Sequence, residues 1–507
     1  MSNVIVMTKR HVFTGDILVA GAGFAGSLMA LILHSQGFRV CLVEKGRHPR
    51  FAIGESSTPI ADMLLRRLSS RYNLPWLAAF SRYGSWQEAH PEIVCGIKRG
   101  FSYFKHYPGK SFATDSDHSN ELLVAASTDD VQSDTNWLRA DLDAFLVSKV
   151  IEAGIPYFDR TEIVSGERSD KWAFHTAAGE CLSAEFFIDA TGGGVLLDRL
   201  FGVGSSSDGF LTDSFAVFSH FHHVPRWVEL LGEAGIPVSD FPYDPDHSAL
   251  HQVLDEGWMW MLRFNDERIS LGFALNGEKH RSEGGSPEEI WNAMLQRYPT
   301  IGKMLCKASL SAQPGRIIRS GRLQRRTKRC FGEGWAALPH TAGFVDPLFS
   351  PGIAHSLTGL QKIAEILEQH WGRDEALYGA LTQYEHGVFE ELTFIDQLVG
   401  GCYKTMDRFE LFNAWSMLYF AATITYEQRL LKGLPPGYFL GADDRAMRAM
   451  VDESYRELMG LIQGPAVAGD AIARFTATVR QRIAPVNIAR LLDPALKNMY
   501  RHTAVSL

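Results

Sequence analysis

Three glycines near the start of the chain have the spacing that holds a dinucleotide pyrophosphate. Gly21, Gly23 and Gly26 follow an apolar segment, and Glu44 stands 18 residues after the last of them. These glycines permit a tight turn, close approach of the phosphates to the backbone, and close packing of the following helix. Glu44 suits an unphosphorylated ribose 2′-hydroxyl, so the motif favours FAD or NAD over NADP. The residues expected to bind the nucleotide are Gly21, Gly23, Phe24, Ala25, Gly26, Glu44 and Lys45.

Two later turns distinguish FAD from NAD. The turn Asp189-Ala-Thr-Gly-Gly193 is similar to the second nucleotide-side turn of FAD-dependent oxidoreductases, and it places Thr191 and Gly192 at the cofactor. The Asp346-Pro347 turn resembles their third FAD segment. Arg139 is a further candidate contact, although a solvated helix arginine explains it equally well on composition alone.

These turns need a common sheet to bring them together. The pattern around the first motif predicts a strand, a helix and a second strand, which form a β-α-β unit. Two more apolar strands lead into the later turns, and a helix follows the last one. The predicted elements are strands Asp16–Ala20, Phe38–Val43, Glu185–Asp189 and Gly334–Leu338 and helices Ser27–Ser35 and Ile353–His370.

Such distant strands share one sheet only if other material is inserted between them. The second insertion alternates like antiparallel strands, over Ala216–Phe221, Trp258–Phe264 and Ile269–Leu275, and the chain after Asp374 has a helical pattern. We therefore expect an α/β protein: an FAD-binding, Rossmann-like three-layer domain, an inserted, mainly antiparallel β-sheet substrate domain, and a helical C-terminal region. The expected boundaries are 14–70, 129–201 and 326–372 for the first, 71–128 and 202–325 for the second, and 373–507 for the third.

Composition excludes several other classes. The 507 residues carry 50 basic and 58 acidic side chains, so the net charge of −8 argues against nucleic-acid binding by bulk electrostatics. Six scattered cysteines without a CxxC pair favour a reducing, cytoplasmic setting and predict no metal site. Residues 1–15 show no signal-peptide pattern, and no apolar run is long enough to cross a membrane; Ala414–Ile424 is expected to be a buried helix.

Taken together, the motifs resemble the flavin-dependent halogenases, and more narrowly those acting on phenol- or pyrrole-like substrates. The resemblance extends from Ile17 to about Tyr426. Its carriers are Gly21-x-Gly-x-x-Gly26, Pro49-Arg-Phe-Ala-Ile-Gly-Glu-Ser-Ser-Thr-Pro59, Cys95-Gly-Ile-Lys-Arg-Gly-Phe101, Gly257-Trp-Met-Trp260 and Gly343-Phe-Val-Asp-Pro-Leu-Phe-Ser-x-Gly352.

The resemblance implies a two-component reaction. A separate NAD(P)H flavin reductase would supply FADH2, which reacts with O2 to a flavin hydroperoxide that oxidises chloride or bromide to hypohalous acid. Lys98 aligns with the family's catalytic lysine; it can hydrogen-bond hypohalous acid as a cation or form a haloamine as an amine. Without the neighbouring motif, Lys98 would be interpreted as a surface lysine at the edge of a strand. The resemblance further implies cofactor contacts at Glu55, Ser56, Arg139, Thr191, Gly192, Asp346, Gly352 and Ile353, a halide site at Ser350, Gly352 and Ile353, and a flavin and substrate wall at Trp258, Trp260 and Phe349.

The chain departs from the family pattern at two places. Leu262-Arg263 replaces the Ile-Pro that closes the tryptophan motif, so Arg263 either binds an acidic substrate or marks a drift away from halogenation. Pro351 occupies a halide-donor position and has no N–H, which would weaken halide binding by tens-fold, on a scale of about 1.5–3 kcal/mol per charge-assisted bond.

The substrate class can be narrowed further by the resemblance. Tryptophan halogenases carry a glutamate where this chain has Phe349, which favours a phenolic or other electron-rich aromatic over an indole. Phe101, Tyr103 and Phe104 either wall such a site or belong to the core. The histidines considered as its proton acceptors are His106, His220 and His222.

One charged feature bears on partners. The basic run from Arg316 to Arg329 is most simply a solvated face, with docking of an acidic carrier protein or contact with FAD phosphates as alternatives. We predict an FADH2-dependent halogenase of a small aromatic substrate, free or carrier-tethered, in specialised-metabolite biosynthesis. The alternatives are an FAD-dependent aromatic monooxygenase that hydroxylates its substrate, and a halogenase-like binding protein without turnover. The oligomeric state stays open.

Overall fold

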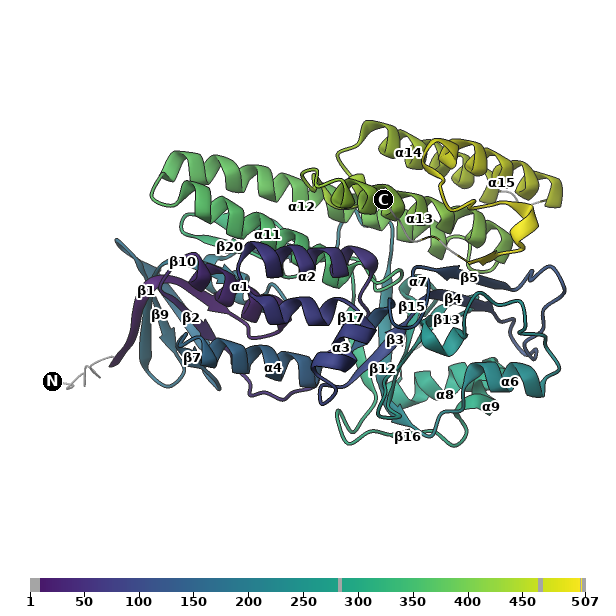
Figure 1. Cartoon of the computed structure of the whole chain (residues 1–507), viewed down its shortest axis with the longest axis horizontal. Helices are drawn as coiled ribbons and strands as arrows, with labels where there is room; N and C mark the ends of the chain where they lie inside the picture. Colours follow the sequence, from purple (N-terminus) through teal and green to yellow (C-terminus); the bar gives the residue numbers. More distant parts are fainter. Residues whose placement is uncertain (1–9, 281–284, 464–467, 502, 504–507) are drawn as a thin grey trace.

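The structure is a computed structural model that describes residues 10–280, 285–463, 468–501 and 503. Residues 1–9, which belong to the segment searched for a signal peptide, lie outside the described part. Two large sheets lie at opposite ends of an elongated molecule, and a layer of helices runs along both of them (Figure 1). This arrangement confirms the expected α/β fold class.

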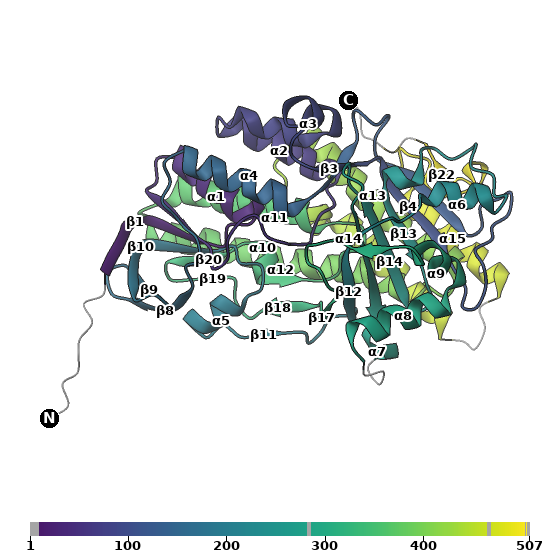
Figure 2. The same cartoon turned by 90° about the horizontal axis from the view of Figure 1, so that it is seen from below.

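The first sheet is built around the parallel strands that the glycine turns terminate. Its order is β19-β20-β10-β1-β2-β7, and β1 pairs in parallel with both β10 and β2. Figure 2 shows helices α1 and α4 on one side of this sheet and strands β8 and β9 on the other. The bounds are β1 Arg10–Ala20, α1 Phe24–Ser35, β2 Val40–Val43, α4 Arg139–Glu152, β7 Tyr157–Phe158, β8 Ile163–Arg168, β9 Trp172–Thr176, β10 Glu180–Asp189, β19 Phe331–Gly332 and β20 Trp335–Ala337.

The predicted strands are present, but strand β1 begins at Arg10, six residues before the predicted Asp16. Helix α1 begins at Phe24 rather than Ser27, because the backbone turns helical directly after Gly23, which is extended at the N-cap. Strand β10 begins five residues before the predicted Glu185, since its first half also pairs with β9.

The second sheet is mainly antiparallel and has the order β16-β12-β15-β14-β13-β4-β5-β22. Two of its contacts are parallel, β13 with β4 and β5 with β22. It contains the three strands predicted from alternation. The bounds are β4 Gly100–Lys105, β5 Glu121–Ala125, β12 Ser214–His222, β13 Ala249–Val253, β14 Gly257–Arg263, β15 Ile269–Asn276, β16 Ser309–Leu310, β17 Ile318–Arg322 and β22 Met499–Tyr500.

Strand β14 separates two apolar cores. Trp258 and Trp260 point into the large core shared with the first sheet and the helices, whereas Met259 and Met261 point into a smaller core of the second sheet. This division follows from strand geometry, because successive side chains of a strand point to opposite faces.

The helical layer crosses both sheets. It contains α11, whose first residue Gly352 precedes the predicted Ile353 by one, and α13, which includes the predicted buried helix Ala414–Ile424. Strand β22 shows that the C-terminal region also contributes an edge strand to the second sheet. The bounds are α11 Gly352–His370, α12 Asp374–Tyr403, α13 Phe409–Leu431, α14 Arg445–Ile462 and α15 Gly469–Ile483.

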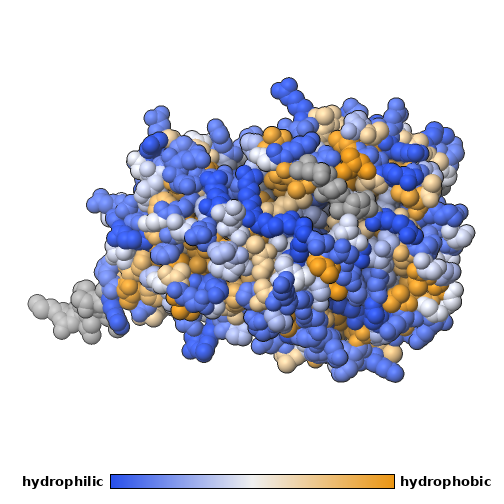
Figure 3. All heavy atoms as spheres, in the orientation of Figure 1, coloured by the Kyte–Doolittle hydropathy of each residue, from blue (hydrophilic) through white to orange (hydrophobic). Residues whose placement is uncertain are grey.

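Apolar residues are largely inside the molecule. The face shown in Figure 3 is mostly hydrophilic, with scattered hydrophobic patches. Among the described residues, none of the helices combines the length and apolar character needed to span a membrane. The domain boundaries given above remain a prediction, since the helices pack against both sheets.

Candidate active site

The glycine motif forms a tight cradle at the end of β1. A Cβ atom at Gly26 would lie 1.8 Å from the carbonyl oxygen of Gly21, and Gly21 itself has a left-handed φ of +99°. Only glycine satisfies both conditions. The Glu44 carboxylate accepts hydrogen bonds from the N–H groups of Ala22 (3.0 Å) and Gly46 (2.8 Å). Burial raises the pKa of Glu44, but Arg50 and these two N–H groups outweigh it, so the pKa is lowered and the carboxylate stays charged.

Arg139 fastens this cradle to the loop before α2 (Pro59–Arg71). Its guanidinium forms an ion pair with Asp143 (2.8 Å) and donates to the carbonyls of Ile53 (3.0 Å) and Gly54 (3.2 Å). It also lies over the Phe24 ring, 4.8 Å from its centre. Since Arg139 is only 8% exposed, the reading as a solvated helix arginine is wrong.

The second turn touches the first. The carbonyl of Ala190 lies 2.7 Å from where a Cβ of Gly21 would be. Asp189 accepts from the N–H of Thr191 (2.8 Å), and burial raises its pKa to about 6. Arg325, a member of the basic run, donates to the carbonyl of Gly192.

The loop Gly54–Thr58 connects this cradle to the second sheet. Glu55 is buried and receives a hydrogen bond from Nε2 of His220 (2.7 Å), a residue of β12. The hydroxyl of Ser56 is buried and has no hydrogen-bond partner among the described residues, whereas Lys45 is exposed. A cradle that admits only glycine, together with an unpaired polar group on the adjoining Gly54–Thr58 loop, fits FAD, whose phosphates and ribose the expected residues would hold.

Lys98 is the last residue of β3 (Cys95–Lys98) and is completely buried. In the antiparallel pair with β6 (Asp134–Trp137), it stands directly opposite Asp134. Its Nζ atom donates to the carbonyl of Ser57 and lies 4.1 Å from the centre of the Phe101 ring. The reading of Lys98 as a surface lysine is therefore wrong.

Burial and two nearby carboxyls together set the pKa of Lys98. Burial lowers the pKa to about 8, and the carboxyls of Asp134 and Asp62 limit the shift. The pKa of Asp134 is itself raised by burial, with Lys98 opposing the shift, and Asp62 is raised by burial and by Asp134. Such a lysine is available as a cation or as an amine, as either role suggested for it requires.

Aromatic rings connect Lys98 with the third FAD segment. Phe101 lies 6.5 Å from Tyr103, Tyr103 lies 6.3 Å from Phe349, and Phe349 stacks on Tyr419 at 4.2 Å, all measured between ring centres. Phe101 and Tyr103 thus belong to this face, while Phe104 lies in the smaller core.

The third segment makes a strained turn before α11. Phe349 and Ser350 both have left-handed φ angles, +68° and +56°. Such angles cost about 1–3 kcal/mol each and persist where the surroundings impose them. Pro351 is the N-cap of α11, so the N–H groups of Gly352 and Ile353 begin the helix. These are the two backbone donors available to a halide in the predicted site.

Asp346 ties this segment to the tryptophan motif. Its carboxyl accepts from Ser214 (2.6 Å) and Tyr403 (2.8 Å), and Tyr403 receives the indole N–H of Trp258 (3.1 Å). Burial raises the pKa of Asp346 to about 6. The Trp258 and Trp260 rings are 5.9 Å apart, and both are buried. The carboxyl of Asp346 is therefore hydrogen-bonded within the protein, so only the backbone of its turn could contact the cofactor.

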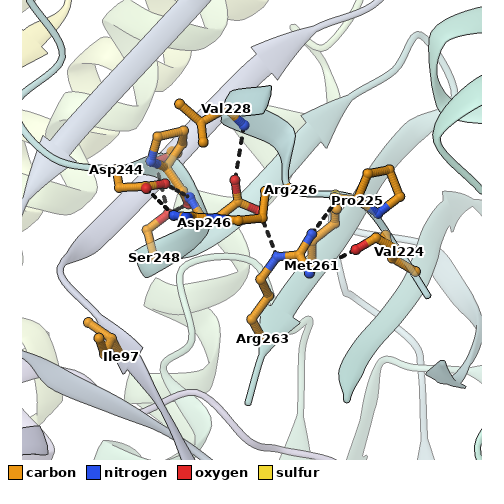
Figure 4. Close-up of polar contacts among 12 residues, drawn as sticks. Ile97, Val224, Pro225, Arg226, Val228, Asp244, Asp246, Ser248, Met261 and Arg263 are labelled. Atoms are coloured by element: carbon orange, nitrogen blue, oxygen red, sulfur yellow. Dashed lines mark hydrogen bonds and ion pairs between the residues drawn. The ribbon is translucent and has the colours of Figure 1, made fainter. Parts of the chain in front are cut away.

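Arg263 is not free to bind an acidic substrate. Its Nε atom lies 2.6 Å from Asp246, a residue of the short helix η2 (Pro245–His247), and its other nitrogens donate to the carbonyls of Val224 and Pro225 (Figure 4). The Asp246 carboxylate is 1% exposed, so it needs this partner. Arg263 replaces the family proline in a structural role.

The predicted histidines do not gather around Lys98. His106 bonds to Gln252 in the smaller core and has a pKa lowered by burial to about 4, and His222 bonds to Ser311. His251, which the sequence analysis did not single out, stacks on Tyr103 at 4.5 Å. Among the described residues, no group of three or more His, Cys, Asp or Glu side chains could hold a metal ion.

Most of the basic run is exposed, as expected for a solvated face, but its side chains contact several different elements. Arg319 lies over the Phe215 ring, Arg322 lies 3.7 Å from Asp213, and Arg329 pairs with Glu385. With Arg325 turned inward, the run divides among several elements.

A glycine-rich nucleotide turn on a parallel sheet, followed by an inserted antiparallel sheet, defines a dinucleotide-dependent oxidoreductase. The family model described as "Tryptophan halogenase" matches residues 139–418, more than half of the chain. The chain belongs to this family, the flavin-dependent halogenases, which are enzymes that use FAD.

Individual relatives agree with this assignment. The chain is 26% identical to monodechloroaminopyrrolnitrin halogenase PrnC of Pseudomonas fluorescens, over 92% of this chain and 85% of the relative. It is 24% identical to tetracycline 7-halogenase of Kitasatospora aureofaciens, over 87% and 79%. Its fold is similar to that of halogenase PltM, solved with phloroglucinol and FAD, at a TM-score of 0.86 and 22% identity over 96% and 99% of the two chains.

Proposed function

We propose that this halogenase chlorinates or brominates an electron-rich aromatic compound by means of hypohalous acid held at Lys98. The observation that carries the proposal is the buried Lys98 ammonium over the Phe101 ring, with a pKa lowered to about 8. Reduced FAD, when bound, supplies the O2-derived oxidising power that converts halide to hypohalous acid. Backbone donors at Gly352 and Ile353 would hold the halide, and Ser350 would shape their turn.

At the lysine, the ammonium donates a hydrogen bond to the oxygen of hypohalous acid, which makes the halogen more electrophilic. A ring carbon attacks the halogen, the halogen–oxygen bond breaks, and the departing hydroxide takes the proton of the Lys98 ammonium and leaves as water. The ring then loses its proton, which restores the ammonium, and regains aromaticity. Trp258, Trp260 and Phe349 would separate flavin from substrate, because their buried rings lie on the same face as the lysine's aromatic neighbours.

The finer assignments follow from the family and the site. We infer a small aromatic substrate of phenol or pyrrole type, free or tethered to a carrier, and a separate NAD(P)H flavin reductase. The six cysteines are free, which suits a cytoplasmic enzyme, and the names of the relatives suggest specialised-metabolite biosynthesis.

The test is a reconstituted reaction with FAD, an NADH-driven flavin reductase, O2, bromide or chloride, and phloroglucinol as the acceptor. Mass spectrometry should show the halogen isotope pattern in the product, and catalase should not suppress it. A product heavier by one oxygen would support the hydroxylase alternative instead, and no modified product would contradict both enzymatic proposals. Reactions without reductase or without halide serve as controls.

A further inference from the structure

A small cavity lies close to Lys98, beside the Phe101 ring. It has a volume of about 20 Å³, room for a single water molecule, and its walls come from the loop before α2, strands β4 and β5, helix α13 and residue 503. The lining residues that bear on its chemistry are Thr58, Phe101, Tyr419 and Glu427.

Two polar groups in this wall have no partner. The Glu427 side chain is 3% exposed and has no hydrogen-bond partner among the described residues. The Thr58 hydroxyl is buried and likewise lacks a partner in the described part of the chain. Buried polar groups are almost always hydrogen-bonded, so two unpaired groups facing one cavity are available to bind a polar partner from outside the chain.

This cavity adjoins the lysine that carries the proposed chemistry. Phe101 lines the cavity and has the Lys98 ammonium 4.1 Å from its ring centre. Lys98 donates to the carbonyl of Ser57, the residue immediately before Thr58. A ring bound in this cavity would therefore lie beside the amine.

The hydrogen-bonding groups of Glu427 and Thr58 indicate what they can bind. Burial and the charge of Asp134 raise the pKa of Glu427 well above its ordinary value. A carboxyl accepts hydrogen bonds in either protonation state, and a threonine hydroxyl both donates and accepts. A phenolic hydroxyl also does both, whereas a pyrrole N–H only donates and would leave a donor of the protein unpaired.

We propose that Glu427 and Thr58 form the polar end of the substrate site and select a small aromatic ring bearing a hydroxyl group. Glu427 comes from α13, two turns after Tyr419, which stacks on Phe349. Glu427 thus places a carboxyl in the site from α13. The tryptophan halogenases instead carry a glutamate at the position of Phe349. A ring is larger than the cavity, so its entry requires lining side chains to move. This proposal rests on the proposed function, because it names the substrate class of the same lysine.

The experiment compares phloroglucinol with 1,3,5-trimethoxybenzene, two rings with similar activation toward halogen but with and without hydroxyl groups. Glu427→Leu and Thr58→Val each remove polar atoms at nearly constant volume, and Gln428→Ala, one residue along α13 and outside the cavity wall, is the control. Bromination efficiency is measured for both rings, phloroglucinol affinity by calorimetry, hypohalous acid release without an aromatic, and folding by circular dichroism.

We expect Glu427→Leu to lower the phloroglucinol-to-trimethoxybenzene preference and the phloroglucinol affinity about tenfold or more, with hypohalous acid release unchanged. Thr58→Val should act in the same direction and serves if the leucine variant does not fold. Unchanged preference and affinity in a folded variant would overturn the inference while leaving the Lys98-dependent reaction intact. If the wild-type enzyme brominates neither ring, the proposed function fails, and calorimetry still decides whether Glu427 binds the phenol.

Discussion

Lys98 and Asp134 face each other directly across the antiparallel pair of β3 and β6. Opposed side chains in such a pair are close enough to interact, and here both are buried. The carboxylate stabilises the ammonium against the cost of burial, which explains why a lysine can remain charged at neutral pH inside the protein.

The first prediction concerns Lys98 itself. Lys98→Met should abolish aromatic halogenation while FADH2 reoxidation and hypohalous acid release continue, because the amine acts after the halide is oxidised. Lys105→Met is the matched control: Lys105 is another buried lysine, but it pairs with Asp255 at 2.5 Å and lies outside the cavity wall. Loss of flavin reoxidation in the Lys98 variant would instead indicate a role at the cofactor.

The pH dependence follows from the pKa of Lys98, which is lowered to about 8. If the ammonium polarises hypohalous acid, the halogenated product formed per FADH2 oxidised should fall as the pH rises through about 8, where the proton is lost. Single-turnover reactions from pH 6 to pH 9.5, roughly one and a half to two units either side of that value, check this. A ratio that rises through the same interval would favour the haloamine route.

Removing the opposing carboxylate should move this alkaline limb. Asp134 raises the pKa of Lys98, so Asp134→Asn should shift the limb to lower pH, below the wild-type value of about 8. Asp130→Asn is the control, since Asp130 pairs with Arg99 at 2.9 Å near the surface. A limb that stays in place would mean that it does not report on Lys98.

The Arg263–Asp246 pair should matter for stability rather than for substrate charge. Arg263→Met leaves the buried Asp246 carboxylate without its ion-pair partner and should cost about 3 kcal/mol, the lower end of the range for such pairs, because Arg263 is 21% exposed. The double variant with Asp246→Asn should recover part of this loss in denaturant unfolding. Strict additivity of the two single losses would contradict the assignment.

Halide affinity should respond to Pro351. Pro351→Ala restores one N–H beside Gly352 at a residue with φ −73° and ψ −20°, a conformation that alanine adopts readily. A charge-assisted hydrogen bond of about 1.5–3 kcal/mol should lower the bromide KM roughly ten- to a hundredfold, with the phloroglucinol KM unchanged. Titration of bromide against brominated product measures it, and Gly352→Pro, which removes a donor, should do the opposite.

Local chemistry made much of the fold predictable. No residue with a side chain fits at Gly21 or Gly26, so the spacing of glycines within six residues is enough to predict the cradle. The alternation of Trp258 and Met259 likewise follows from strand geometry. The class of the cofactor and the orientation of β14 could therefore be predicted.

Burial and pairing at the site depend on distant segments and could not be predicted. Lys98 is enclosed by Ser57 and Asp134, which come from two other elements. From the sequence, Arg263 is expected to be available for an acidic substrate, because its partner Asp246 lies 17 residues earlier, on a short helix. Glu427 lies three residues after the apolar run of α13 and is followed by Gln428 and Arg429, so its local sequence does not indicate that it is buried.

Substitutions in strand β14 should have two kinds of effect, depending on which of the two cores the side chain faces. Substitutions at Trp258 and Trp260 change the environment shared with Asp346 and the nucleotide half of the molecule, and so should alter turnover and acceptor scope. Exchanges at Met259 and Met261 reach only the smaller core, where an unbranched thioether tolerates replacement by leucine. A mutant collection built on alternate codons of this strand should therefore sort into variants with new selectivity and variants with a new melting temperature.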